Sequence, residues 1–165
     1  MGTFAVQLAK AYGAHVTGVC RTAKTDLVRS LGADHVIDHT REDVTTGTDR
    51  YDLLLDTAGN RPLARLRGAL APRGTLVLVG GPGGGRVLQG ADRQIRAMLL
   101  SPFVGQRLTG LLSTEPAADL RTLADLIDSG TLTPAVDRTY PLARTPDAIA
   151  YLRTGEHAGK IAITV

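Results

Sequence analysis

The chain has 165 residues, of which 43% are hydrophobic and 21% charged, and these values fit a globular domain with its own hydrophobic core. It contains no run of about 18 apolar residues, so we expect no membrane span. The net charge of +3 comes from scattered arginines rather than a basic run, which argues against a nucleic-acid partner. The lone cysteine, Cys20, excludes an internal disulfide and fits the reducing cytoplasm, where we expect the protein to reside.

Helical and strand patterns alternate along the chain. Apolar residues recur at helical spacing from Phe4 to Tyr12, and Gly13 follows at the position typical of a helix end. The segment YDLLLD (51–56) is apolar on both faces, as in the centre of a parallel sheet. Further strands are predicted over residues 15–20, 34–38, 74–80, 106–113, 135–142 and 160–165, and further helices over 22–32, 61–70, 93–101, 116–130 and 145–155.

This alternation predicts an α/β fold with a doubly wound, mostly parallel sheet of the Rossmann type. The chain opens on a helix, MGTFAVQLAK, with no strand pattern before it, so we expect the sheet to lack its first strand. The order of elements changes near Thr133 and Pro134. We therefore predict one domain over residues 1–133, followed by a strand–helix–strand segment over 134–165.

Candidate nucleotide-binding residues stand at one helix start and one strand end. Gly2 precedes the first helix, whose N-terminus would face a pyrophosphate. Alternatively, Gly2 has no binding role and is only a permissive residue after the initiator Met. After the strand 15–20, Arg21, Thr22 and Lys24 offer two cations and a hydroxyl but no carboxylate. Such a group suits the 2′-phosphate of NADP rather than the ribose diol of NAD. Alternatively, Arg21 and Lys24 are two solvated charges at a strand–helix turn and bind no ligand.

Two further loops follow predicted strands and could line a ligand crevice. In the segment DTAGN, Ala58 and Gly59 would let the backbone approach a ligand closely. The segment GGPGGGRV has the glycine spacing of a P-loop, but Arg86 and Val87 replace the Lys and the Ser or Thr that bind phosphate and Mg²⁺ there. We therefore reject a P-loop for this segment.

The sequence predicts no metal site and no catalytic constellation. Cys20 and the four histidines do not have a spacing that would hold zinc. No Ser-His-Asp or Cys-His arrangement can be argued from spacing, so the catalytic residues stay unassigned. Cys20 closes an apolar strand and is interpreted as a small buried hydrophobe.

Five segments, taken in order, carry a resemblance to a known family: AVQLAKAYGAHVTGVC, LGADHVIDHTREDV, YDLLLDTAGN, LAPRGTLVLVGG and GKIAITV. They resemble the quinone oxidoreductase-like, zinc-independent branch of the medium-chain dehydrogenase/reductase superfamily. The resemblance implies an NADPH-dependent enzyme that transfers a hydride to a small-molecule substrate, a quinone or another activated enone or carbonyl compound. Family members have an N-terminal catalytic domain, a Rossmann domain and a C-terminal return into the catalytic domain, and residues 134–165 resemble that return.

The resemblance also assigns positions of this chain to parts of NADPH. It places Gly2 and Thr3 at the pyrophosphate, and Arg21, Thr22 and Lys24 at the 2′-phosphate, with Cys20 before them as a further cofactor-binding residue. It places His39 at the adenine and Ala58 and Gly59 at the adenosine half. The nicotinamide end is assigned to Gly80, Gly81, Ser101, Pro102, Phe103 and Val104, and Lys160 lies in the opening of the last strand. A preference for NADPH implies that Arg21→Ala and Lys24→Ala weaken binding of NADPH but not of NADH, each by about 1–3 kcal/mol.

The sequence departs from the family pattern at its start, which lacks the catalytic domain and the first Rossmann strand with its glycines. We expect a truncated reading frame or an expressed fragment, whose bare sheet edges lower its stability or are covered by self-association, for example in a homodimer. Two other functions stay open: a non-catalytic nucleotide-binding remnant and an S-adenosylmethionine-dependent methyltransferase. The methyltransferase is disfavoured because Cys20 and Arg21 stand where its ribose-binding acid is needed.

Overall fold

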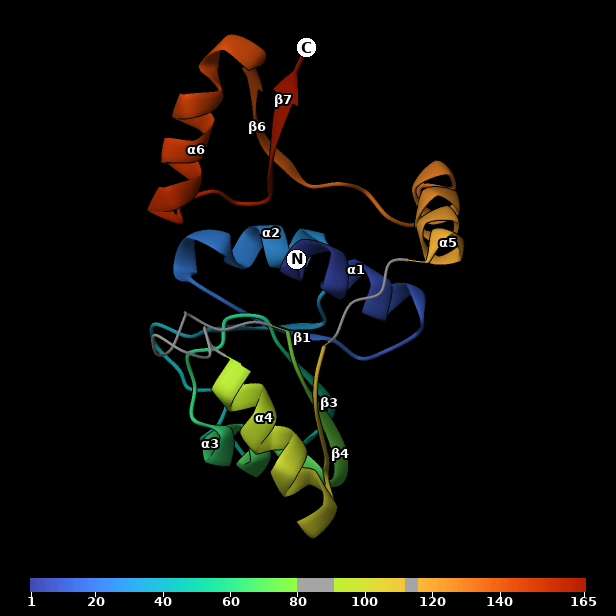
Figure 1. Ribbon diagram of the computed structural model, residues 1–165, viewed down its shortest axis with the longest axis vertical. Coiled ribbons are helices and arrows are strands. Elements are labelled where there is room, and N and C mark those ends of the chain that lie inside the picture. The colour runs from blue at the N-terminus through green and yellow to red at the C-terminus, as the bar shows by residue number, and fades with distance from the viewer. Residues whose placement is uncertain (80–90, 112–115) are drawn as a thin grey trace. The chain divides into compact units, whose positions relative to one another are not determined.

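The protein, seen here in a computed structural model, is described over residues 1–79, 91–111 and 116–165. It divides into two compact units, of which the first combines Met1–Glu42 with Glu115–Val165 and the second is Asp43–Thr114. Figure 1 shows the helices and strands of both units. None of the helices in the described ranges has the length and apolar character needed to cross a membrane.

The N-terminal part of the first unit contains two parallel strands. Helix α1 (Gly2–Ala11) leads to β1 (Thr17–Cys20), and η1 (Thr22–Lys24) and α2 (Thr25–Ser30) connect β1 to β2 (His35–Asp38). Gly13, with φ of 78°, lets the chain leave α1 in the left-handed region, as the sequence predicts. Helix α2 approaches β1 closely because Gly18 has no side chain, and a Cβ there would collide with Val28.

The C-terminal part of the first unit is the predicted strand–helix–strand segment, preceded by a long helix. Its elements are α5 (Ala117–Asp128), β6 (Val136–Pro141), η3 (Leu142–Arg144), α6 (Thr145–Thr154) and β7 (Lys160–Thr164). Strands β6 and β7 pair in parallel, and α6 lies alongside both (Figure 1). Buried Gln7 of α1 exchanges two hydrogen bonds with the backbone of Thr133, Nε2 to O at 3.0 Å and N to Oε1 at 2.8 Å.

The second unit is a three-stranded parallel sheet in the order β3-β4-β5. Its elements are β3 (Tyr51–Asp56), α3 (Leu63–Gly68), β4 (Leu70–Leu78), α4 (Ala91–Leu100), η2 (Ser101–Phe103) and β5 (Arg107–Gly110). Leu76 and Leu78 of the central strand are fully buried and form a core with Leu66 of α3 and Ala97 of α4. Both helices therefore pack on one face of this sheet.

These strand pairs confirm the predicted Rossmann-type α/β class. Each of these sheets pairs its strands in parallel, and helices connect the strands along the chain, as in a doubly wound fold. Residues 133 and 134 both lie in the first unit, and the domain boundary proposed between them stays a prediction.

Two details of the sequence prediction are wrong. Strand β3 is not buried on both faces, because Leu53 and Leu55 are 62% and 44% exposed. Of the three leucines of β3, Leu54 is the one on the face that α3 and α4 cover. In addition, β4 begins at Leu70, inside the predicted helix 61–70, because Leu70 pairs with Tyr51 in the parallel ladder.

Candidate functional site

At the carboxyl end of β1, one cation forms no ion pair with any residue that the structure describes. Arg21 follows the last strand residue with an extended backbone, and its side chain is exposed. It takes part in none of the ion pairs found in the described part of the chain. The neighbouring Cys20 thiol has its pKa raised, first by burial and then by the negative charge of Asp38, so it is not an activated nucleophile at neutral pH. Arg21 is therefore the group at this strand end that is available to an anion.

Thr22 is engaged by a carboxylate that the sequence analysis did not assign to the site. Asp38, opposite Cys20 in the strand register, accepts a short hydrogen bond from the Thr22 hydroxyl. It also accepts from the hydroxyl and amide of Thr40, at 2.7 and 3.0 Å. The hydrogen bonds from Thr22 and Thr40 lower the pKa of Asp38 to about 2. Since a hydroxyl has one proton, Thr22 as placed here cannot also donate to a phosphate.

Lys24 is held by the C-terminal part of the same unit. Its ammonium donates to the carbonyl oxygens of Gly155 at 3.1 Å and His157 at 2.7 Å, and the side chain is half-buried. These carbonyls lie in the connection between α6 and β7. Two of the three N–H donors of Lys24 are thus occupied, and the residue ties the turn after β1 to this connection. Sequence spacing could not reveal these partners, because they lie more than 130 positions away.

The start of α1 leaves backbone donors open. The first amide that bonds within the helix is that of Phe4, to the carbonyl of Met1, so the amides of Gly2 and Thr3 have no acceptor inside the helix. Lys160, the first residue of β7, lies 5.4 Å from the centre of the Phe4 ring. Burial, and next the charge of Lys160, lower the pKa of the Met1 amine. The structure therefore brings Gly2, Thr3 and Lys160 together at one positive helix end.

His39 lies at the end of β2 and is exposed. Its backbone amide donates to the carbonyl of Cys20 at 2.9 Å, so the parallel pairing continues one residue beyond the strand. The imidazole enters no side-chain hydrogen bond in the described part of the chain, and its predicted contact with an adenine stays a prediction.

In the second unit, the turn after β3 is held by two charged side chains. Asp56 is buried, and its Oδ1 accepts from the amide of Gly59 at 3.0 Å. Its Oδ2 lies 2.6 Å from Nη2 of Arg93, and the same nitrogen donates to the carbonyl of Arg61 at 2.7 Å. Gly59 has φ of 69°, while Ala58 is exposed at the tip of the turn. The turn is therefore closed by Arg93 and Asp56, two residues that the sequence analysis did not assign to the site.

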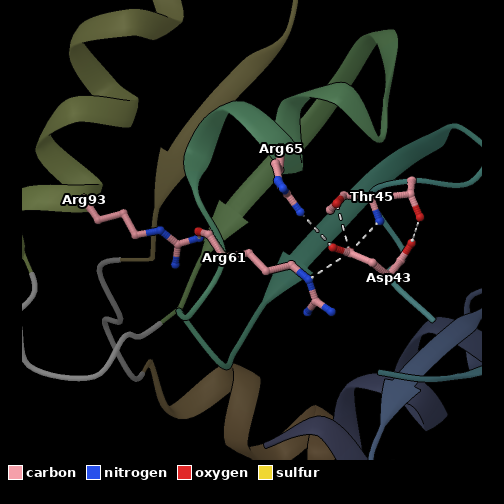
Figure 2. A network of polar contacts seen from close by, with 6 residues as sticks. Asp43, Thr45, Arg61, Arg65 and Arg93 are labelled. Atoms are coloured by element: carbon pink, nitrogen blue, oxygen red, sulfur yellow. Dashed lines mark hydrogen bonds and ion pairs between the residues drawn. The ribbon is translucent and has the colours of Figure 1, made fainter. Parts of the chain in front are cut away.

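A second polar cluster supports the segment after this turn (Figure 2). Asp43 accepts from the amide and hydroxyl of Thr45, both at 2.9 Å, and these bonds lower its pKa. It also pairs with Nε of Arg61 at 3.2 Å and with Nη1 of Arg65 at 3.3 Å. Figure 2 shows the guanidinium of Arg93 at the backbone of Arg61, whose own side chain points away toward Asp43. The three arginines therefore do not converge on one anion site.

The residues predicted at the nicotinamide end are not brought to this turn. Pro102, Phe103 and Val104 precede β5, and Gln106 contacts the carbonyl of Ala71 at the amino end of β4. Ala58 and Gly59 lie at the opposite, carboxyl end of the sheet, where dinucleotides bind in such folds. Phe103 is 84% exposed and borders an open apolar groove of about 490 Å³ beside α3 and α4. Gly80 and Gly81 lie outside the described residues.

The fold and the geometry of the site together define a class of protein. Parallel strands joined by helical crossovers, together with a helix start whose first amides have no acceptor inside the helix, are typical of a Rossmann-type nucleotide-binding domain. Residues 31–163 match the model of the zinc-binding dehydrogenase family, and the chain belongs to this family.

Named relatives are oxidoreductases. The chain is 33% identical over 183 residues to the mitochondrial NAD(P)H oxidoreductase RTN4IP1 of Mus musculus, covering 100% of this chain and 45% of the relative. It is 32% identical to the chloroplastic NADPH-dependent alkenal/one oxidoreductase of Arabidopsis thaliana, covering 99% of this chain and 37% of the relative. The chain thus spans less than half the length of these relatives.

Solved structures agree on the fold. The quinone oxidoreductase of Coxiella burnetii superposes with a TM-score of 0.81 at 23% identity, covering 99% of this chain and 49% of that one. A putative alcohol dehydrogenase of Sinorhizobium meliloti 1021 gives a TM-score of 0.80 at 25% identity, with 99% and 45% covered.

The family description raises the question of zinc. In the described ranges, no group of three or more His, Cys, Asp or Glu side chains could hold a metal ion. The donor set of the described residues therefore does not fit a zinc ion, and no chemistry is assigned to one.

Proposed function

We propose that the chain is the nucleotide-binding part of an oxidoreductase that uses NADPH to reduce a quinone or another activated enone or carbonyl substrate. The observation that carries this proposal is the carboxyl end of β1, where exposed Arg21 stands in place of a ribose-binding acid. The names of the relatives support the reaction class. NADPH, when bound, supplies the hydride that reduces an electrophilic carbon of the substrate.

The residues of the first unit are assigned to binding and orientation. Arg21 would pair with the 2′-phosphate, since a guanidinium matches phosphate oxygens in a two-pronged geometry. The open amides of Gly2 and Thr3 would receive a pyrophosphate oxygen, with the charge of Lys160 beside them. Within the second unit, Ala58 and Gly59 are proposed to present backbone to the cofactor.

The test is equilibrium binding of NADPH and NADH to the full chain, followed by absorbance at the nicotinamide band with a panel of quinones and enones. We expect NADPH to bind more tightly than NADH, and Arg21→Ala to remove that difference. Arg29→Ala is the matched control, because Arg29 is exposed on the adjacent α2 and, among the described residues, pairs only with Asp26. Binding of S-adenosylmethionine without NADPH would refute the proposal, and NADPH binding without oxidation would reduce it to a nucleotide-binding module.

A further inference from the structure

Arg93 makes contacts that no assigned role explains. It lies in the first turn of α4, and its Nη2 meets the Asp56 carboxylate at 2.6 Å and the Arg61 carbonyl at 2.7 Å. These two partners, the last residue of β3 and Arg61, flank the turn of residues 57–60 (Figure 2 shows the contact with Arg61). Asp56 in addition holds the amide of Gly59 at 3.0 Å. One nitrogen of Arg93 therefore closes the turn from both ends.

This pair is the most buried of the ion pairs formed by the described residues. The side chains of Arg93 and Asp56 are 17% and 9% exposed, compared with 21% and 32% for Arg61 and Asp43. Nε and Nη1 of Arg93 are buried and meet no acceptor among the described residues. Withdrawing such a pair from water is costly, and excellent geometry and further hydrogen bonds are needed to offset that cost. The contacts that Arg93 does make with the described residues are those that hold the turn after β3.

We propose that Arg93 is a positioning residue for the nucleotide: it fixes the turn 57–60 through Asp56 and the Arg61 carbonyl, and thereby sets the affinity for the dinucleotide. This inference rests on the proposed function, because it takes Ala58 and Gly59 as cofactor contacts. Gly59 depends on Asp56 for its amide partner, and Asp56 depends on Arg93 for its charge partner. A shift of Arg93 is therefore transmitted to the backbone that faces the ligand, although Arg93 itself does not touch it.

The test compares Arg93→Gln and Arg93→Lys with Arg96→Gln in the full chain. Arg96 is the matched control, because it lies one turn further along α4, is exposed and has no ion pair in the described part of the chain. Two quantities are measured: hydrogen exchange of the amides of residues 57–60, and dissociation constants for NADPH and NADH. Arg93→Gln is expected to speed exchange in the turn and to weaken both dinucleotides by about tenfold, the scale found for residues that orient a contact from behind.

The two dinucleotides separate this role from that of Arg21. Loss of Arg93 is expected to affect NADPH and NADH equally, because the turn does not read the 2′-phosphate, whereas loss of Arg21 affects NADPH alone. Arg93→Lys keeps the positive charge and a hydrogen-bond donor, so it is expected to recover part of the affinity for both dinucleotides. If Arg93→Gln does not fold, Arg93→Lys takes its place in the comparison.

Three results would overturn the inference: unchanged exchange and affinity in Arg93→Gln, an equal effect of Arg96→Gln, or a loss confined to NADPH. A wild-type chain that binds neither dinucleotide refutes the proposed function and with it the effect of Arg93 on affinity. In that case the exchange of residues 57–60 still decides whether Arg93 holds the turn.

Discussion

Replacing Lys24 by Met separates two roles that sequence alone would assign to the same residue. The Met side chain keeps the apolar stem of Lys24 but removes the ammonium from the carbonyls of Gly155 and His157. The sequence-based prediction was a selective loss of NADPH affinity. The structure instead predicts that the unit is destabilised, because two backbone oxygens lose a charged donor.

The magnitude follows from the contacts. A hydrogen bond from a charged donor contributes about 1.5–3 kcal/mol where it is shielded from water. Lys24 is half-buried, and water can replace part of each bond, so we expect a total loss of about 1–2 kcal/mol for the pair. For a chain of 165 residues this lowers Tm by about 2–8 °C.

The assay is thermal unfolding followed by circular dichroism, with NADPH and NADH binding measured on the same samples. Lys24→Met is expected to lower Tm and to change the two affinities by the same factor. Arg21→Ala is expected to leave Tm within about 1 °C, because exposed substitutions away from such contacts change stability little. An unchanged Tm in Lys24→Met, together with a selective loss of NADPH, would refute this reasoning.

Two further predictions concern a glycine and a carboxylate of the first unit. Gly159→Ala is expected to cost about 3 kcal/mol or more in urea unfolding, because Gly159 has φ of 145° and a Cβ there would fall on the carbonyl oxygen of Ala135. Gly155→Ala, where φ is 70° and the space is open, should cost only about 1 kcal/mol, and equal losses would contradict the steric argument. The hydrogen bond from Lys10 lowers the pKa of Asp34 from 3.8 to about 2. The contribution of the ionised Asp34 to the free energy of unfolding is therefore complete above pH 4 and is lost as the pH falls to about 2. Asp34→Asn should therefore flatten the fall of Tm over this interval, and a profile parallel to the wild type would refute the assignment.

Much of the fold follows from local patterns in the sequence. The periodicity of α1 and the glycine at position 13 predict where the first helix ends, and the alternation of elements predicts parallel pairing. Burial of β3 could not be predicted in the same way. The apolar run that includes Leu53 and Leu55 shows what could be buried, but burial depends on whether another element covers that face.

In the candidate site, too, local features could be predicted from the sequence and long-range contacts could not. The position of Arg21 directly after a strand could be predicted, because it is a local property of the sequence, whereas its contact with a cofactor stays a prediction. The partners of Lys24 and the pairing of Arg93 with Asp56 depend on segments distant in the sequence, where no spacing rule applies. Thr22 is an intermediate case: Asp38 ends the next strand, so parallel register alone could have placed the two side chains together.

The division of the chain into two units also sets an order of events during synthesis. The second unit is continuous in sequence, so it can fold as soon as residue 114 has emerged. The first unit cannot, since Lys24 waits for His157, which is 133 positions later. At about 5–20 residues per second, the delay is on the order of ten seconds. During that interval β1 and β2 exist without the segments that will hold them, while folding of the inserted unit shortens the loop that must close. During that interval, residues 1–42 are therefore a segment of the nascent chain that chaperones and proteases can reach.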